Sequence, residues 1–172
     1  MELIFATDNS KQFSTTLTPG QCMGMSCDWA KVSLTLKDVY FDALTPGKWD
    51  LGQTAYEMGT SRTDRKIIEA FLMRITNGGG NGIRHNVGTA LDVVNNLVAL
   101  PQGIYVWGLE GHGGGHALGY ERTATTYDLF DPNFGLLRTD NLLDFRQTLT
   151  DSINDYYSDL LQNQDIYQVA LP

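Results

Sequence analysis

The sequence predicts an α+β fold, with helices in the first part of the chain and antiparallel strands in the second. Up to about residue 100, apolar residues recur at spacings of three and four, the pattern of helices that bury one face. After Pro101 the apolar runs become short and rich in β-branched and aromatic residues, and Gly-rich or Thr-rich turns separate them. Helices followed by antiparallel strands indicate an α+β arrangement.

Three helices are expected before Pro101. The first covers about 20–37 and has one apolar stripe: Met25, Trp29, Val32 and Leu36. The second covers about 63–75 and ends at Asn77-Gly78. The third covers about 87–100, ends before the helix-breaking Pro101, and turns these residues inward: Leu91, Val94 and Leu97 or Val98. The Gly-rich segment 77–82 lacks the Gly-Lys-Ser/Thr sequence of a phosphate-binding loop, so we expect an ordinary loop there.

Strands and one long helix are expected after Pro101. Three segments have the composition of strands: Gly103–Glu110, His116–Glu121 and Tyr127–Asp131. Asp140 or Asn141 is suited to cap the helix that follows, because a short polar side chain accepts hydrogen bonds from the first helical N–H groups. That helix is expected to bury four residues: Leu149, Ile153, Tyr156 and Leu160. A last strand is expected at Ile166–Leu171.

The composition predicts one soluble domain over residues 1–172. With 42% hydrophobic residues, a chain of this length closes one sizeable core and leaves no material for a second. A net charge of -8, with the basic residues scattered, argues against nucleic-acid binding. No apolar run approaches the length of a membrane span, and the first residues lack the pattern of a cleavable signal peptide.

Cys22 is the candidate nucleophile. A thiol attacks only as the thiolate, and an ordinary cysteine is mostly protonated at neutral pH. The predicted start of a helix at Cys22 supplies partial positive charge that favours the thiolate, and a nearby imidazolium would add to it. The other cysteine, Cys27, lies five residues on along the same predicted helix, too far for a disulfide, so both are expected to be free thiols.

His116 and Asp131 are the candidate partners of Cys22. A hairpin centred between Thr123 and Ala124 would place His116 directly opposite Asp131, with Cβ atoms about 4.5–5.5 Å apart on one face. Asn133 would then be diagonal and farther, and Asp128 would point to the opposite face. A thiolate and an imidazolium that a carboxylate orients form the cysteine version of the nucleophilic triad.

Three blocks of the sequence contain these residues. They are Gly20-Gln21-Cys22-Met23-Gly24-Met25-Ser26 followed by Trp29, Gly115-His116-Ala117, and Leu129-Phe130-Asp131-Pro132-Asn133-Phe134-Gly135. In this order they resemble the motifs of the YopT-type effector cysteine peptidases, a family that includes the AvrPphB-like avirulence proteases of plant pathogens. The resemblance implies a papain-like fold with Cys22, His116 and Asp131 as the catalytic triad and with no cofactor.

The resemblance also implies a biological setting. A peptidase of this family would be secreted by a bacterial effector system into a target cell, where it would cleave a host protein. An immunity or chaperone protein is a further candidate partner. One feature departs from the family: the residues five and six before Cys22 are Leu17 and Thr16, where an amide side chain would complete the oxyanion hole. Gln12, Thr18 and Gln21 are the alternatives for that donor.

Three other interpretations compete with the peptidase. A papain-like triad also serves amidases, deamidases and transglutaminases that act on peptidoglycan or on protein side chains, and Trp107 with the glycine runs would suit a cleft for any of them. His112, His116 and Asp131 could instead ligate zinc, although Gly113-Gly114-Gly115 disfavours the helix that a spacing of four requires. In a binding module without activity, Cys22 would be a core residue and Asp131 would only satisfy His116.

Overall fold

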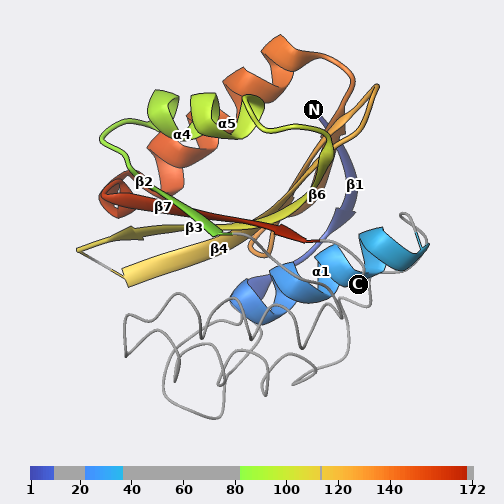
Figure 1. Cartoon of the computed structure of the whole chain (residues 1–172), viewed down its shortest axis with the longest axis horizontal. Helices are drawn as coiled ribbons and strands as arrows, with labels where there is room; N and C mark the ends of the chain where they lie inside the picture. Colours follow the sequence, from blue (N-terminus) through green and yellow to red (C-terminus); the bar gives the residue numbers. More distant parts are fainter. Residues whose placement is uncertain (10–21, 37–81, 113, 170–172) are drawn as a thin grey trace.

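The computed structural model describes residues 1–9, 22–36, 82–112 and 114–169 (Figure 1). Within these residues it contains a seven-stranded sheet with the order β1-β6-β5-β4-β3-β7-β2, in which all neighbours are antiparallel. The strands are β1 (Glu2–Ala6), β2 (Gly82–Asn86), β3 (Gly103–Gly111), β4 (Gly114–Arg122), β5 (Tyr127–Asp131), β6 (Gly135–Thr139) and β7 (Asn163–Val169). The helices are α1 (Cys22–Leu36), α4 (Ala90–Val98), α5 (Leu142–Tyr156) and the short 3₁₀ helix η2 (Ser158–Leu160).

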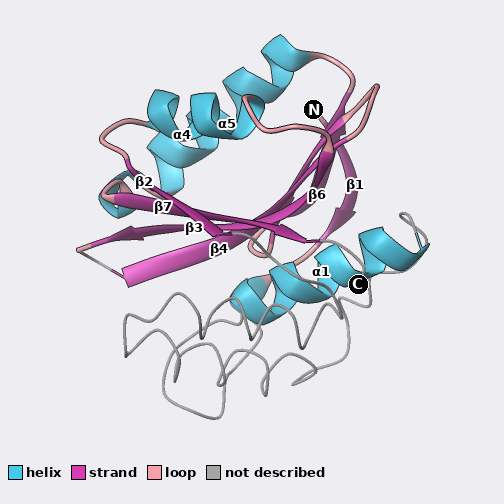
Figure 2. Ribbon diagram, in the orientation of Figure 1, coloured by secondary structure: helices cyan, strands magenta, loops and turns pink. Residues whose placement is uncertain are grey.

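The helices cover both faces of the sheet (Figure 2), which therefore has a core on each side. Helices α4 and α5 pack on one face, where the buried residues include Val94, Leu97, Tyr105, Trp107 and Phe145. Helix α1 packs on the other, where they include Met25, Trp29, Val106, Ala117 and Phe130. Because successive strand residues point to opposite faces, each strand of the sheet's centre supplies both cores.

Trp29 determines how closely α1 approaches the sheet. Its ring stacks on that of Phe130, with centroids 5.5 Å apart and an angle of 5° between the planes. The indole also lies over Gly119 of β4, at the place where a Cβ atom would be. Only glycine at position 119 lets α1 lie this close to β4, which positions the first turn of the helix beside the start of that strand.

Replacing Gly119 with alanine is therefore expected to destabilise the protein. The added methyl group would collide with the Trp29 ring and force α1 away from the sheet, and overpacking of this kind costs about 1–3 kcal/mol. The measurement is the free energy of unfolding in urea. Gly88→Ala is the matched control, because a Cβ atom there meets only Asp92 Oδ2 at 3.9 Å. Equal unfolding free energies for the two variants would contradict the role of Gly119.

The predicted α+β class is confirmed, and several elements match their predicted positions. The first helix begins at Cys22 and ends at Leu36, and β3, β4 and β5 coincide closely with the three predicted strands. The predicted helix at 63–75 and nearly all of the Gly-rich segment lie outside the described residues. No helix in the described ranges is both long enough and apolar enough to cross a bilayer.

Some predicted boundaries were wrong. The third helix begins at Ala90, because Thr89 caps it: the Thr89 side chain accepts from Asp92 N–H and the Asp92 carboxylate accepts from Thr89 N–H. Leu91 of that helix is exposed rather than inward. The last strand begins at Asn163, before its predicted start at Ile166, and residues 170–171 of the prediction lie outside the described residues.

The long helix before that strand ends at Tyr156, whose side chain is also exposed rather than buried. Its cap is Asn141, one of the two alternatives, which accepts hydrogen bonds from Leu143 N–H and Asp144 N–H. The helix is thus held at its start by a side-chain cap, and its last residue precedes Tyr157.

Three strands were not predicted, and they are β1, β2 and β6. Strands β1 and β2 form the two edges of the sheet. Their burial does not alternate along the chain, so they lack the pattern from which strands are predicted. The predicted order along the chain, with helices first and strands second, was therefore only partly right, because β1 precedes α1 and β2 precedes α4.

Candidate active site

Cys22 is the first residue of α1 and is half-buried. One turn further along the helix, Ser26 holds α1 against β4, because its hydroxyl donates to the carbonyl oxygen of Ala117 at 3.0 Å. Burial is the largest single influence on the pKa of the Cys22 thiol, and it raises that pKa. The hydrogen bond and charge of His116, with the N–H groups of Ala117 and Met23, act in the opposite direction. Together they outweigh burial, so the pKa of Cys22 is lowered. The thiol is therefore set up to ionise more readily than an ordinary cysteine.

Cys27 has the opposite environment. It is fully buried in the core under α1, and its thiol contacts the sulfur of Met23 at 3.7 Å. Burial, followed by the charge of Asp28, raises the pKa of Cys27 well above its ordinary value. Both cysteines are free thiols, as expected, and only Cys22 is favoured as a thiolate.

His116 lies in β4, beside Cys22, and is almost completely buried. Its Nε2 atom is 3.1 Å from Oδ1 of Asp131, so Nδ1 is the ring nitrogen left for the Cys22 thiol. Burial acts most strongly on the pKa of His116 and lowers it, but the hydrogen bond to Asp131 and the interactions with Cys22 prevail and raise the pKa to about 10. A buried imidazole that stays protonated near neutral pH is the partner that a thiolate requires.

Asp131 ends β5, and its carboxylate accepts hydrogen bonds on both oxygens. Oδ1 accepts from His116 and from the backbone N–H of Asn133 at 2.9 Å. Oδ2 accepts from the hydroxyl of Tyr157 at 2.7 Å. The side-chain amide of Asn133 in turn donates to the Tyr157 hydroxyl at 2.9 Å. A carboxylate that is only 2% exposed is thus fully hydrogen-bonded, which is what keeps a buried charge stable.

Tyr157 is the residue at this site that the sequence did not reveal. It follows α5 directly, and its ring stacks on the ring of His116, with centroids 4.6 Å apart and an angle of 18° between the planes. The predicted helix extended through Leu160, so Tyr157 was placed inside it without a role. Helical periodicity carries no information about a side chain that lies beyond the true end of a helix.

The predicted register of the β4–β5 hairpin was wrong by two residues. Arg122 pairs with Tyr127 and Gly119 with Phe130, and continuing this register places Asp131 opposite Leu118 instead of His116. The loop has four residues, closed by hydrogen bonds from Thr123 N–H to Thr126 O and from Thr126 N–H to Thr123 Oγ1. Because a shift of two keeps every side chain on its face, His116 and Asp131 still meet.

Other predictions at the site have mixed outcomes. Asp128 is on the opposite face, as predicted, and pairs with Arg138, whose Nε is 2.8 Å from Oδ1 of Asp128. Trp107 does not line a cleft, because it is fully buried under α4 and α5. His85 lies in the edge strand β2, away from the His116–Asp131 pair. The alternatives for the second oxyanion donor, Gln12, Thr18 and Gln21, lie outside the described residues.

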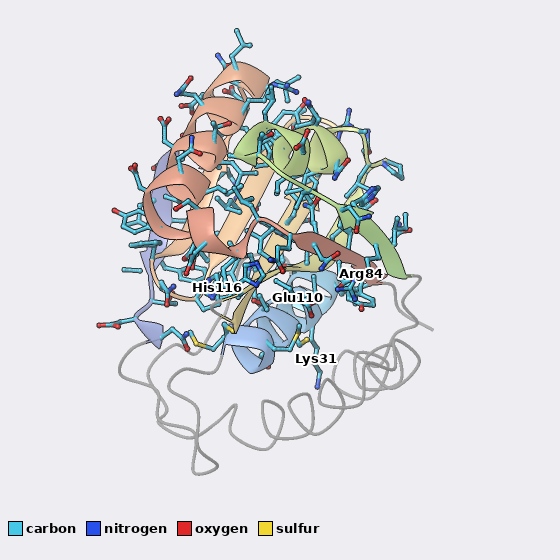
Figure 3. The ribbon with its side chains drawn as sticks, turned by 90° about the vertical axis from the view of Figure 1, so that its left-hand side faces the viewer. Lys31, Arg84, Glu110 and His116 are labelled. Carbon is cyan, nitrogen blue, oxygen red and sulfur yellow. The ribbon has the colours of Figure 1, made fainter. Side chains whose placement is uncertain are left out.

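A separate charged group lies to one side of His116 (Figure 3). Arg84 of β2 donates to Glu110 of β3 at 2.6 Å and approaches Asp165 of β7 at 3.5 Å. Lys31 extends from α1 away from the sheet in the same view. Glu110 and Asp165 pair with Arg84, whereas the carboxylate that is hydrogen-bonded to His116 is that of Asp131. In the described part of the chain, no three His, Cys, Asp or Glu side chains are arranged to hold a metal ion.

Comparison with solved structures identifies the fold. AvrPphB, a Pseudomonas avirulence protein, superposes with a TM-score of 0.65 at 15% sequence identity, over 87% of this chain and 91% of AvrPphB. PatoxP, a cysteine protease-like domain of the Photorhabdus asymbiotica toxin PaTox, gives a TM-score of 0.48 at 11% identity, over 98% of this chain and 54% of that one. UfSP from C. elegans gives 0.41 at 12% identity, over 100% and 35%.

The AvrPphB comparison carries the assignment, since its TM-score is well above 0.5 and nearly all of both chains superpose. No protein-family model matches the chain, and no curated protein matches its sequence. The chain has the papain-like cysteine protease fold of AvrPphB, the fold that the resemblance of its three motif blocks implied.

Proposed function

We propose that the protein is a cysteine peptidase in which Cys22 is the nucleophile, His116 the general base and acid, and Asp131 the residue that orients His116. The observation that best supports this is the Cys22 thiol at the first residue of α1, beside a buried imidazole that Asp131 holds. The pKa of Cys22 is lowered and that of His116 is raised. Both shifts favour the thiolate–imidazolium pair over the neutral thiol and imidazole.

In the first half-reaction the Cys22 thiolate attacks the carbonyl carbon of the scissile peptide bond. The electron pair of the carbonyl moves to its oxygen, and the backbone N–H of Cys22 at the start of α1 donates to that oxyanion. The intermediate collapses, the C–N bond breaks, and His116 gives its Nδ1 proton to the leaving amine. The products are a thioester on Cys22 and a fragment with a new N-terminus.

In the second half-reaction water cleaves the thioester. Neutral His116 removes a proton from the water as it attacks the thioester carbon, the C–S bond breaks, and the acid fragment leaves. The thiolate and the imidazolium are regenerated together. Asp131 takes part in both half-reactions through Nε2, because this hydrogen bond keeps Nδ1 directed at the reacting atoms and stabilises the imidazolium.

The proposed substrate is a protein of a host or target cell, which the peptidase would reach by secretion through a bacterial effector system. Two likenesses support this setting: the motif blocks around Cys22, His116 and Asp131 resemble those of the YopT-type effector peptidases, and the fold is that of a Pseudomonas avirulence protein.

The test compares the protein with its Cys22→Ala variant in extracts of candidate target cells, with new N-termini labelled and identified by mass spectrometry. A peptidase produces N-termini that are present with the unaltered protein and missing with the variant. Released muropeptides, or a glutamine-to-glutamate mass shift without new N-termini, would assign the site to an amidase or deamidase instead. The same N-termini in both samples would refute peptidase activity.

A further inference from the structure

A single side chain, Tyr157, contacts both members of the His116–Asp131 pair. Its ring stacks on the His116 imidazole, and its hydroxyl donates to Oδ2 of Asp131. Tyr157 is only 6% exposed, and its backbone N–H closes the end of α5 by donating to the carbonyl oxygen of Ile153 at 2.9 Å. Since Ile153 is itself buried in the core, the position of Tyr157 is set by the packing of α5 on the sheet.

We propose that Tyr157 is a positioning residue of the active site, which holds the Asp131 carboxylate and the His116 ring in the orientation that directs His116 at Cys22. The inference rests on the proposed function, because an orientation of this kind matters only if His116 activates the thiol. Tyr157 does not touch the reacting atoms, and its effect passes through Asp131 and His116.

The hydrogen bonds at Asp131 explain how the hydroxyl acts. Oδ1 accepts from His116 and Asn133, whereas the hydroxyl of Tyr157 is the donor that the structure gives to Oδ2. Rotation of the carboxylate about its Cβ–Cγ bond would break all three hydrogen bonds together. Without the hydroxyl, Oδ2 would be a buried acceptor with no side-chain donor among the described residues, and the carboxylate would be free to turn toward any other donor or water.

The direction of the Tyr157 hydrogen bond is also determined. The side-chain amide of Asn133 donates to the Tyr157 oxygen, so the hydroxyl proton is left for Asp131. Burial, followed by the negative charge of Asp131, raises the pKa of Tyr157 far above its ordinary value, although the hydrogen bond from Asn133 lowers it. Tyr157 therefore remains a donor throughout the pH range in which a thiolate–imidazolium pair exists.

The ring of Tyr157 acts on His116 directly. A stacked ring at 4.6 Å covers one face of the imidazole and hinders its rotation about the Cβ–Cγ bond. Among the described residues, the titratable groups that act on His116 besides the stacked Tyr157 are Cys22 from α1 and Asp131 from β5, and the same two act on the Tyr157 hydroxyl. A substitution at Tyr157 is therefore expected to change the pKa of Cys22 through its contacts with Asp131 and His116.

The test measures the rate at which iodoacetamide alkylates Cys22 as a function of pH, with the modified residue identified by mass spectrometry. In the unaltered protein Cys22 should react near pH 6, faster than the buried Cys27. In Tyr157→Phe, which keeps the ring and loses the hydroxyl, the acid limb of the Cys22 profile should move up by about 0.5–1 pH unit, because the less firmly held imidazolium stabilises the thiolate less. Tyr157→Leu, which also loses the stacked ring, should show a larger shift.

Tyr156→Phe is the matched control, because it removes a hydroxyl from the neighbouring residue, whose side chain is exposed. Its profile should superpose on that of the unaltered protein. A Tyr157→Phe profile that also superposes would overturn the inference, since a merely structural residue changes the amount of folded protein without moving the limb.

A second variant keeps the inference testable if Tyr157→Phe does not fold. Asn133→Ala removes the amide that donates to Tyr157 but leaves the Asn133 N–H bond to Asp131 in place. A smaller upward shift in this variant supports the inference, and an unchanged profile overturns it. Failure of the proposed function has a different signature: Cys22 of the unaltered protein would react no faster than Cys27 at pH 6.

Discussion

Replacing His116 with alanine is expected to abolish peptide-bond cleavage, with a loss in kcat/KM of at least about 10⁴-fold. The variant lacks the group that protonates the leaving amine and activates water. It also lacks the hydrogen bond and positive charge that lower the pKa of Cys22, while the burial that raises this pKa remains. The thiol should therefore stay protonated near neutral pH. Cleavage of a substrate identified by N-terminal labelling, followed over time, provides the measurement.

Two further variants make this result specific. Cys22→Ala should be as inactive as His116→Ala, because the two residues act as one unit and losing either removes the whole pathway. His85→Ala should cleave at the normal rate, since His85 lies in the edge strand β2 and pairs with Gln164 of β7. Full activity in His116→Ala would reject the mechanism, provided that the far-ultraviolet circular dichroism of the variant matches that of the unaltered protein.

Replacing Asp131 with asparagine is expected to leave a measurable remnant of activity, with kcat/KM lowered by roughly 10²- to 10⁴-fold. The amide keeps the shape of the carboxylate and still offers one oxygen to His116, but it carries no charge to stabilise the imidazolium. The NH₂ group would also face either the two donors that now meet Oδ1 or the Tyr157 hydroxyl that now meets Oδ2. One donor would then point at another, so the side chain would orient His116 less firmly.

The readouts for Asp131→Asn are kcat/KM and the pH dependence of Cys22 alkylation. The acid limb of the alkylation profile should move to higher pH, because an imidazolium without a charged partner forms less readily and stabilises the Cys22 thiolate less. Asp159→Asn makes the same chemical change on the exposed surface of η2 and should alter neither readout. An Asp131→Asn variant with normal kcat/KM would remove Asp131 from the mechanism and leave Cys22 and His116 as a pair.

The geometry of the site explains why the expected loss in kcat/KM is larger for His116→Ala than for Asp131→Asn. His116 is itself the group that moves protons, whereas Asp131 and Tyr157 act on the reaction only through the ring that they hold. Loss of a group that moves protons removes a step, while loss of a group that orients it lowers the fraction of time in which the step can occur. The expected losses therefore decrease from His116 to Asp131 to Tyr157.

The sequence by itself determined the elements whose signal is local. The start of α1 at Cys22 and the strands that hold His116 and Asp131 follow from apolar spacing, from β-branched and aromatic content, and from turn residues, all within short stretches of chain. The shared face of His116 and Asp131 was likewise predictable, since it depends on the period of two along a strand and survived a register error of two residues.

Only the tertiary structure decided the features that join distant parts of the chain. Strand β1 is recognisable as a strand only through its pairing with β6, far along the chain, because its own residues show no regular alternation of buried and exposed side chains. Tyr157 reaches Asp131 only because α5 ends where its packing on the sheet places it. Periodicity describes which way a residue faces on its own element, and the meeting of two elements depends on how both pack.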